Sequence, residues 1–150
     1  MCCRFADLSG ETDILHASTV RIAERGVLII GPSGAGKSAL ALQLIALGAT
    51  LVADDRTRVS RHGDDVIADV PESIAGLIEA RGLGILRVPH VGPTPLALVV
   101  DLSQAEQDRL PPPRSHRVLG LDIPCLHRVD GPHFASAILL YLRCSISSEQ

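Results

Sequence analysis

The stretch Gly31-Pro32-Ser33-Gly34-Ala35-Gly36-Lys37-Ser38 decides the fold, and it fits the pattern G-x-x-x-x-G-K-S/T. Glycines let backbone N–H groups converge on phosphate oxygens, and the N-terminus of the following helix adds its positive end. The lysine of this pattern reaches the β- and γ-phosphates, and the serine hydroxyl ligates magnesium. We therefore expect residues 31–38 to bind ATP or GTP together with Mg²⁺.

The residues around this loop predict a strand, a helix and a second strand. Val27–Ile30 is a continuous β-branched and aliphatic run, typical of a buried strand. Apolar residues recur with helical spacing from Lys37 to Leu47, and Leu51–Ala53 is a second short apolar run that ends at Asp54-Asp55. These elements predict a right-handed βαβ crossover with parallel strands.

The rest of the chain is dominated by short apolar segments. We expect further strands at residues 13–23, 57–60, 66–70, 85–88, 96–102 and 118–126. A short helix is expected at 72–78, a proline-rich loop at 104–115, and a closing helix at 132–144. The chain is therefore expected to be one α/β domain over residues 1–150 with a mixed sheet, and residues 1–12 are expected to be a flexible or loosely packed N-terminus.

Composition excludes several classes of protein. Apolar residues make up 46% of the chain and aromatic residues 2%, so the core should be aliphatic. A net charge of −3 argues against nucleic acid or an anionic membrane as a partner, and no apolar run approaches the ~20 residues of a membrane span. Four cysteines (Cys2, Cys3, Cys125 and Cys144) show no disulfide or zinc-type spacing, which favours the cytoplasm.

Two further features concern the charged residues. Lys37 is the single lysine among 14 basic residues, which indicates that this position needs a compact ammonium rather than a guanidinium. Asp54 and Asp55 end a strand beside the phosphate loop, where a Walker B acid would lie. Two consecutive acids allow one to serve the metal and the other to face an incoming hydroxyl.

Four further features belong together. His16 precedes the phosphate loop, and residues 51–55 read L-V-A-D-D. Residues 79–85 read E-A-R-G-L-G-I, and residues 108–110 read D-R-L. In these four features the sequence resembles the catalytic domain of bacterial HPr kinase/phosphorylase, in a short form lacking the N-terminal domain: they match the spacing of the family's catalytic histidine, its L-V-A-D-D, its E-x-R-G-L-G-I signature and the segment that carries its catalytic arginine.

The resemblance implies an ATP-dependent protein serine kinase with a fold related to that of phosphoenolpyruvate carboxykinase. Asp55 would accept the proton of the acceptor hydroxyl, Asp54 would support the metal end, and Ser38 and Glu79 would hold Mg²⁺. His16 and Arg109 would lie near the transferring phosphate. The implied substrate is a seryl residue of an HPr-like phosphocarrier protein of the phosphotransferase system, and the implied assembly is a homo-oligomer, usually a hexamer.

The chain also departs from this family. The expected proline- and arginine-rich loop near the end, which supports the reverse phosphorylase reaction, is poorly matched by residues 123–131. The sequence therefore predicts weak reverse activity at most. Two other functions stay open at this point: a nucleotide-gated binding module without significant turnover, and a small-molecule kinase.

Overall fold

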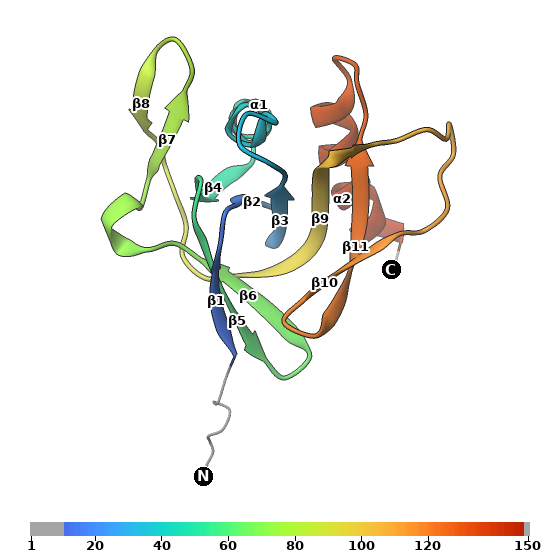
Figure 1. The fold of residues 1–150 in the computed structure, drawn as a ribbon, viewed down its shortest axis with the longest axis horizontal. Coiled ribbons are helices and arrows are strands. Elements are labelled where there is room, and N and C mark those ends of the chain that lie inside the picture. Colours follow the sequence, from blue (N-terminus) through green and yellow to red (C-terminus); the bar gives the residue numbers. More distant parts are fainter. Residues whose placement is uncertain (1–10, 149–150) are drawn as a thin grey trace.

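The computed structural model describes residues 11–148, with side chains as far as residue 144. The expected loosely packed segment at residues 1–12 therefore falls almost entirely outside the described residues. Two α-helices are described, α1 (Lys37–Ala46) and α2 (Phe134–Ser148), and residues Glu72–Ile74 form a short 3₁₀ turn (Figure 1). No helix within residues 11–148 has the length and apolar character needed to cross a bilayer.

The strands of the main sheet are β1 (Thr12–Leu15), β2 (Ser18–Ile22), β3 (Arg25–Ile30), β4 (Thr50–Ala53), β5 (Thr57–His62), β6 (Asp65–Asp69), β9 (Thr94–Ala105), β10 (Ser115–Val118) and β11 (Leu121–Arg128). Seven of them follow the order β1-β5-β6-β9-β3-β2-β4, and β11 pairs with β9 and with β10. Strand β9 runs parallel to both β3 and β11, whereas its pairing with β6 is antiparallel. The predicted mixed sheet is confirmed.

The two strands that flank the phosphate loop are not neighbours in the sheet. Strand β2 lies between β3 and β4 and is antiparallel to both, so β3 and β4 run in the same direction but do not pair. The parallel direction predicted for these two strands is confirmed, and the structure places β2 between them. Ala23 and Glu24 form a two-residue turn between β2 and β3, and their φ values are 51° and 66°. Two positive φ values in succession make the tight turn that pairs β2 directly with β3.

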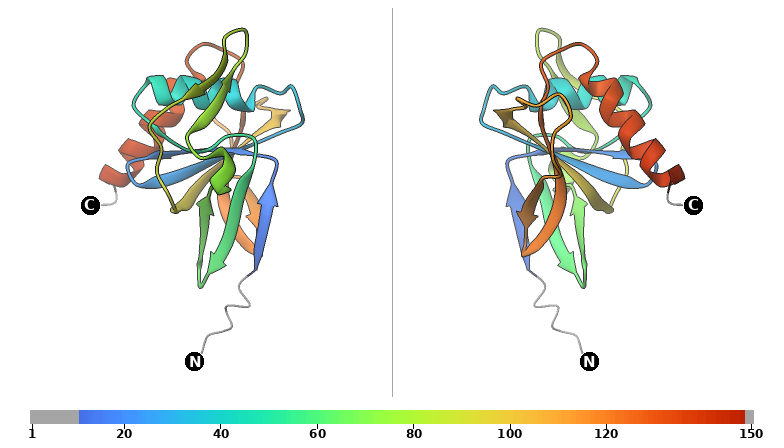
Figure 2. Two further views of the ribbon diagram at one scale, coloured as in Figure 1. Left: turned by 90° about the vertical axis from the view of Figure 1, so that its left-hand side faces the viewer. Right: turned by 90° about the vertical axis from the view of Figure 1, so that its right-hand side faces the viewer.

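Both faces of the central strands are buried. Val27 and Ile29 of β3 point into one cluster, which includes Leu44 of α1 and Ile138 of α2, and Leu28 points into the other. Figure 2 shows both helices on one side of the central strands and the β1–β5–β6 part on the other. This arrangement explains why the apolar run of β3 is unbroken, because each successive side chain enters a core. Full burial of one such side chain contributes about 1.5–3 kcal/mol.

Three elements differ from the sequence expectation. The single strand expected at 13–23 is two strands, β1 and β2, separated at His16 and Ala17. The helix expected at 72–78 is limited to the 3₁₀ turn, and its last residues belong to strand β7 (Leu77–Ala80). The strand expected at 118–126 is the hairpin of β10 and β11.

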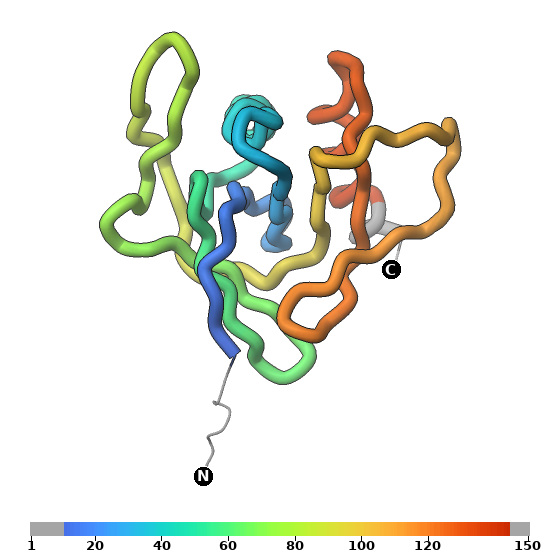
Figure 3. Tube along the Cα trace, viewed as in Figure 1, coloured from blue at the N-terminus to red at the C-terminus, as the bar shows by residue number. Residues whose placement is uncertain are grey.

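Two segments project from this body on opposite sides (Figure 3). One is the hairpin of β7 and β8 (Gly84–Arg87), which forms a separate two-stranded sheet. The other is loop 106–114, whose ends are joined because Arg114 donates two hydrogen bonds to the Glu106 carboxylate, at 3.1 and 2.8 Å. The Arg114 guanidinium lowers the pKa of the Glu106 carboxyl to about 2, so Glu106 is ionised at neutral pH.

Candidate functional site

The phosphate loop, residues 31–38, connects the end of β3 to the start of α1. Gly34 and Gly36 have φ values of 84° and 99°, which residues with a Cβ rarely adopt. A turn within the loop is closed by the Ala35 N–H, which donates to the Pro32 carbonyl at 3.0 Å. The chain thus enters α1 from a left-handed glycine. The first N–H groups of an α-helix have no acceptor within the helix itself, which suits them to bind an anion.

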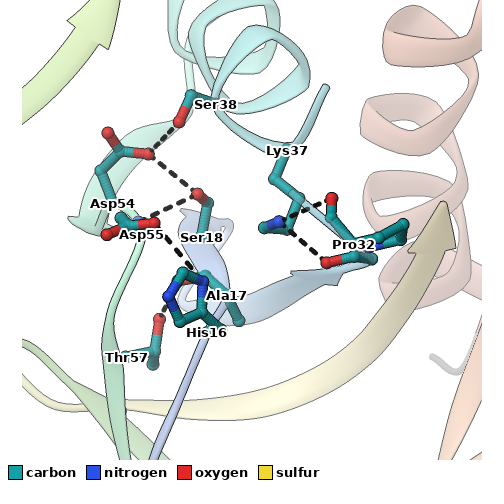
Figure 4. Close-up of polar contacts among 10 residues, drawn as sticks. His16, Ala17, Ser18, Pro32, Lys37, Ser38, Asp54, Asp55 and Thr57 are labelled. Atoms are coloured by element: carbon teal, nitrogen blue, oxygen red, sulfur yellow. Dashed lines mark hydrogen bonds and ion pairs between the residues drawn. The ribbon is translucent and has the colours of Figure 1, made fainter. Parts of the chain in front are cut away.

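Lys37 folds back over this loop. Its Nζ atom donates to the carbonyl oxygens of Gly31, at 2.8 Å, and Pro32, at 3.1 Å (Figure 4). The residue is only 8% exposed. Its ammonium is therefore held beside the phosphate loop by neutral acceptors, and an incoming phosphate, which carries full negative charge, would compete favourably for it.

Asp54, directly after β4, binds three separate segments of the chain. Its Oδ1 atom accepts hydrogen bonds from the hydroxyl of Ser38, at 2.6 Å, and from that of Ser18, at 2.8 Å, while Oδ2 accepts from the Glu79 N–H at 3.0 Å (Figure 4 shows the two hydroxyl bonds). Asp54 is 8% exposed. A buried carboxylate needs such partners, because an unpaired charge in the interior is costly. The acid thus fixes the phosphate-loop serine relative to β2 and β7.

Asp55 stands next to Asp54 but faces solvent. Its backbone is left-handed, with φ at 72°, and its N–H donates to the Ser18 hydroxyl at 3.2 Å. The Nδ1 atom of His16 lies 3.6 Å from Asp55 Oδ1, and the two side chains are 70% and 57% exposed (Figure 4). His16 occupies the break between β1 and β2, which brings it to the carboxylate of Asp55.

A pocket of about 450 Å³ joins these features. Its walls come from the phosphate loop, the first turns of α1, the segment between β4 and β5, and the hairpin of β7 and β8. Its lining residues are Ser33, Gly34, Gly36, Lys37, Ser38, Ala39, Leu42, Gln43, Asp55, Glu79 and Arg81. The structure therefore brings together the sequence-predicted loop, Asp55 and Glu79 around one hollow. Glycine N–H groups, an ammonium and carboxylates at one hollow suit a metal-bound polyphosphate.

The site offers oxygen donors of the kind that Mg²⁺ prefers. The Ser38 hydroxyl and the Asp54 carboxylate are in contact, and Glu79 lines the same pocket. Among the described residues there is no group of three or more His, Cys, Asp or Glu side chains that could hold a metal by themselves. Magnesium bound through one or two protein oxygens together with substrate phosphates fits this donor set.

Several predicted site residues do not line this pocket. Asp54 and His16 contact lining residues from outside it, through Ser38 and Asp55 respectively, whereas Arg109 lies on a separate loop. Arg109 is exposed on loop 106–114 and is not among the pocket-lining residues.

The sequence does not single out Arg81, which lines the pocket, or Ser18, which contacts both acids. The sequence offers a signal for Arg81, because this residue lies within the signature-like stretch of residues 79–85. A serine within a strand, such as Ser18, has no sequence pattern that indicates a role in a site.

The family model described as HPr Serine kinase C-terminal domain matches residues 7–126. HPr kinase/phosphorylase of Alkaliphilus metalliredigens is 40% identical over 130 residues, which cover 78% of this chain and 42% of that protein. The corresponding protein of Halalkalibacterium halodurans is 41% identical over 128 residues, covering 77% and 41%. The chain thus spans about two fifths of the length of these curated relatives.

A solved structure has the same fold. The Hpr(Ser) kinase/phosphatase from Coxiella burnetii superposes with a TM-score of 0.77 and 26% sequence identity, covering 91% of this chain and 92% of that one. This likeness extends beyond the phosphate loop to nearly the whole chain, including the mixed sheet.

Replacement of Lys37 tests whether this pocket binds a nucleotide. Lys37→Ala should abolish measurable Mg–ATP binding in calorimetry, and Lys37→Arg should restore it only in part, because a planar guanidinium does not reproduce the compact ammonium. Arg117→Ala removes the same unit of charge from an exposed site outside the pocket and should bind normally. Unchanged affinity in a folded Lys37→Ala variant would show that the loop does not bind nucleotide.

Proposed function

The chain belongs to the HPr serine kinase C-terminal domain family, and on that basis we propose that it is an ATP-dependent kinase that phosphorylates a seryl residue of an HPr-like phosphocarrier protein. The observation that carries this proposal is the placement of Asp55 in the lining of the phosphate-loop pocket. A module that only binds nucleotide requires the loop but no second acid beside it. The proposed setting is the cytoplasm.

In the proposed reaction, the hydroxyl oxygen of the acceptor serine attacks the γ-phosphorus of ATP. The bond from that phosphorus to the β–γ bridging oxygen breaks, and ADP leaves with the bonding electrons. Asp55 accepts the hydroxyl proton as general base. Its solvent-exposed carboxylate is open to an acceptor that arrives from outside, whereas the buried Asp54 has no free access.

The remaining residues would bind and orient the nucleotide. Lys37 would exchange its two carbonyl partners for phosphate oxygens, and the loop N–H groups would bind the same phosphates. Ser38 and Glu79 would hold Mg²⁺, with Asp54 supporting Ser38. The metal would neutralise charge on the phosphate oxygens. His16, whose Nδ1 atom lies 3.6 Å from Asp55 Oδ1, would lie near the transferring phosphate.

Arg109 is proposed to stabilise charge on the same phosphate. Because it does not line the pocket of its own chain, this role requires loop 106–114 to approach the pocket by movement or from a neighbouring copy. The proposed homo-oligomer, a hexamer by family resemblance, would supply such a neighbour. The Glu106–Arg114 ion pair fixes the two ends of the loop and leaves Arg109 near its middle.

The role of Asp55 can be separated from nucleotide binding by one substitution. Asp55→Asn should keep Mg–ATP affinity within a few-fold while lowering phosphoryl transfer to the protein acceptor by ~10² or more, as expected for the loss of a general base. Asp64→Asn, which removes an exposed acid from the turn between β5 and β6, is the matched control. Near-normal transfer by Asp55→Asn would remove Asp55 from the mechanism.

The direction of the reaction is a separate prediction. In the reverse reaction phosphate attacks a phosphoserine, which brings additional anionic charge that fixed cations must offset. In residues 123–131 the available arginine is Arg128, and it is already bonded to Asp130 and to the Leu102 carbonyl, both at 2.9 Å. We expect dephosphorylation in millimolar phosphate to be slower than phosphorylation in ATP. Initial rates on the same protein pair measure this, and a reverse rate equal to the forward rate would contradict it.

A further inference from the structure

Ser18 is a fully buried polar residue, with 0% exposure, at the start of β2. Its hydroxyl donates to Asp54 Oδ1 at 2.8 Å and accepts from the Asp55 N–H at 3.2 Å. One hydroxyl group therefore bridges the two consecutive acids of the site, using both its donor and an acceptor position. The same oxygen atom of Asp54 is bound by Ser38 of the phosphate loop.

The backbone of Asp55 needs this support. Its φ of 72° is an uncommon conformation for a residue with a side chain, and such residues persist where their surroundings hold them. Two hydrogen bonds hold the backbone of Asp55. Its N–H donates to the hydroxyl of Ser18 in β2, and its carbonyl accepts from the N–H of Ala17, the residue before β2, at 3.1 Å. The exposed carboxylate has only His16, at 3.6 Å, as an ionic partner among the described residues.

We propose that Ser18 is a positioning residue that holds Asp55 in its left-handed conformation and links it, through Asp54, to the phosphate loop. The proposal rests on the proposed kinase function, because it assigns Ser18 a role in setting the general base of that reaction. The backbone of Asp55 sets the direction of its carboxylate, and the Ser18 hydroxyl is one of the two groups that hold this backbone. A small displacement of a catalytic group is enough to lower the rate strongly.

The neighbouring residue supplies a matched control. Thr19 is also 0% exposed, and its hydroxyl lies 2.8 Å from that of Thr57, which itself donates to the Ala17 carbonyl. Neither of these two hydrogen bonds involves Asp54 or Asp55. Thr19→Val therefore removes a buried hydroxyl from the same strand at nearly constant volume and leaves the bridge between Asp54 and Asp55 intact.

The first measurement is amide hydrogen exchange at Asp55, which needs no activity. Ser18→Ala should speed exchange of the Asp55 N–H by ~10-fold or more, since the hydrogen bond that protects it is lost. Thr19→Val should leave that rate unchanged. Equal protection of Asp55 in wild type and in Ser18→Ala would overturn the proposal. If the alanine variant does not fold, Ser18→Cys, with a thiol that bonds weakly, should show the same change.

The second measurement is a double-mutant cycle on phosphoryl transfer. Ser18→Ala should lower transfer by ~10-fold with Mg–ATP affinity within ~3-fold, and in the Asp55→Asn background it should add less than ~2-fold, because residues that act as a unit are not additive. The same loss in both backgrounds, or an equal loss in Thr19→Val, would overturn the positioning role. If wild type transfers nothing to a seryl protein, the proposed function fails, while amide exchange still decides whether Ser18 holds Asp55.

Discussion

The carboxylate of Asp54 is the interaction on which the site depends. It is buried and ionisable, and its two oxygens accept hydrogen bonds from β2, from the first turn of α1 and from β7. Hydrogen bonds to a charged acceptor are stronger than neutral ones, and removing one partner of a buried charge is costly. The Asp54 carboxylate thereby fixes three segments that are distant in the sequence. One of them is the end of the phosphate loop, through Ser38.

The sheet makes this convergence geometrically necessary. Strand β4 delivers Asp54 to the same end of the sheet at which β3 enters the phosphate loop, because both strands run in the same direction. Strand β2 lies between them, so its residue Ser18 faces the acid from the intervening position. Apolar clusters on both faces hold these strands in place, and the polar network occupies their ends. Asp55 then follows at the surface, where an acceptor can approach.

Local patterns in the sequence predicted the phosphate loop, strand β3 and helix α1, because glycine spacing, an aliphatic run and helical periodicity are all short-range signals. The position of β2 between β3 and β4 could not be read in this way, since pairing depends on partners separated by many residues. The sequence predicts one strand over residues 13–23, because apolar residues occur on both sides of the break at His16 and Ala17. It predicts a helix that extends to Ile78, because a strand of four residues such as β7 carries little periodicity.

The candidate site likewise combines residues that short-range sequence motifs predict with residues whose role depends on distant partners. Lys37, Ser38 and the acid pair follow from motifs. In the structure Lys37, Ser38 and Asp55 line one pocket together with Glu79, and Asp54 accepts a hydrogen bond from Ser38. The bridging role of Ser18 has no sequence signature, because a hydroxyl in a strand becomes informative only when its buried partners are known. Arg109 was placed at the site by family resemblance alone, and the position of its loop is set by the ion pair between Glu106 and Arg114.

The central claim is that this arrangement transfers phosphate to a protein serine. The most direct measurement incubates the chain with Mg²⁺, ATP carrying a labelled γ-phosphate and an HPr-like protein, and then identifies the labelled amino acid by mass spectrometry. The account predicts label on a serine of the acceptor protein, dependent on Mg²⁺. Nucleotide binding without label in any protein, or label recovered only in a small molecule, would contradict it.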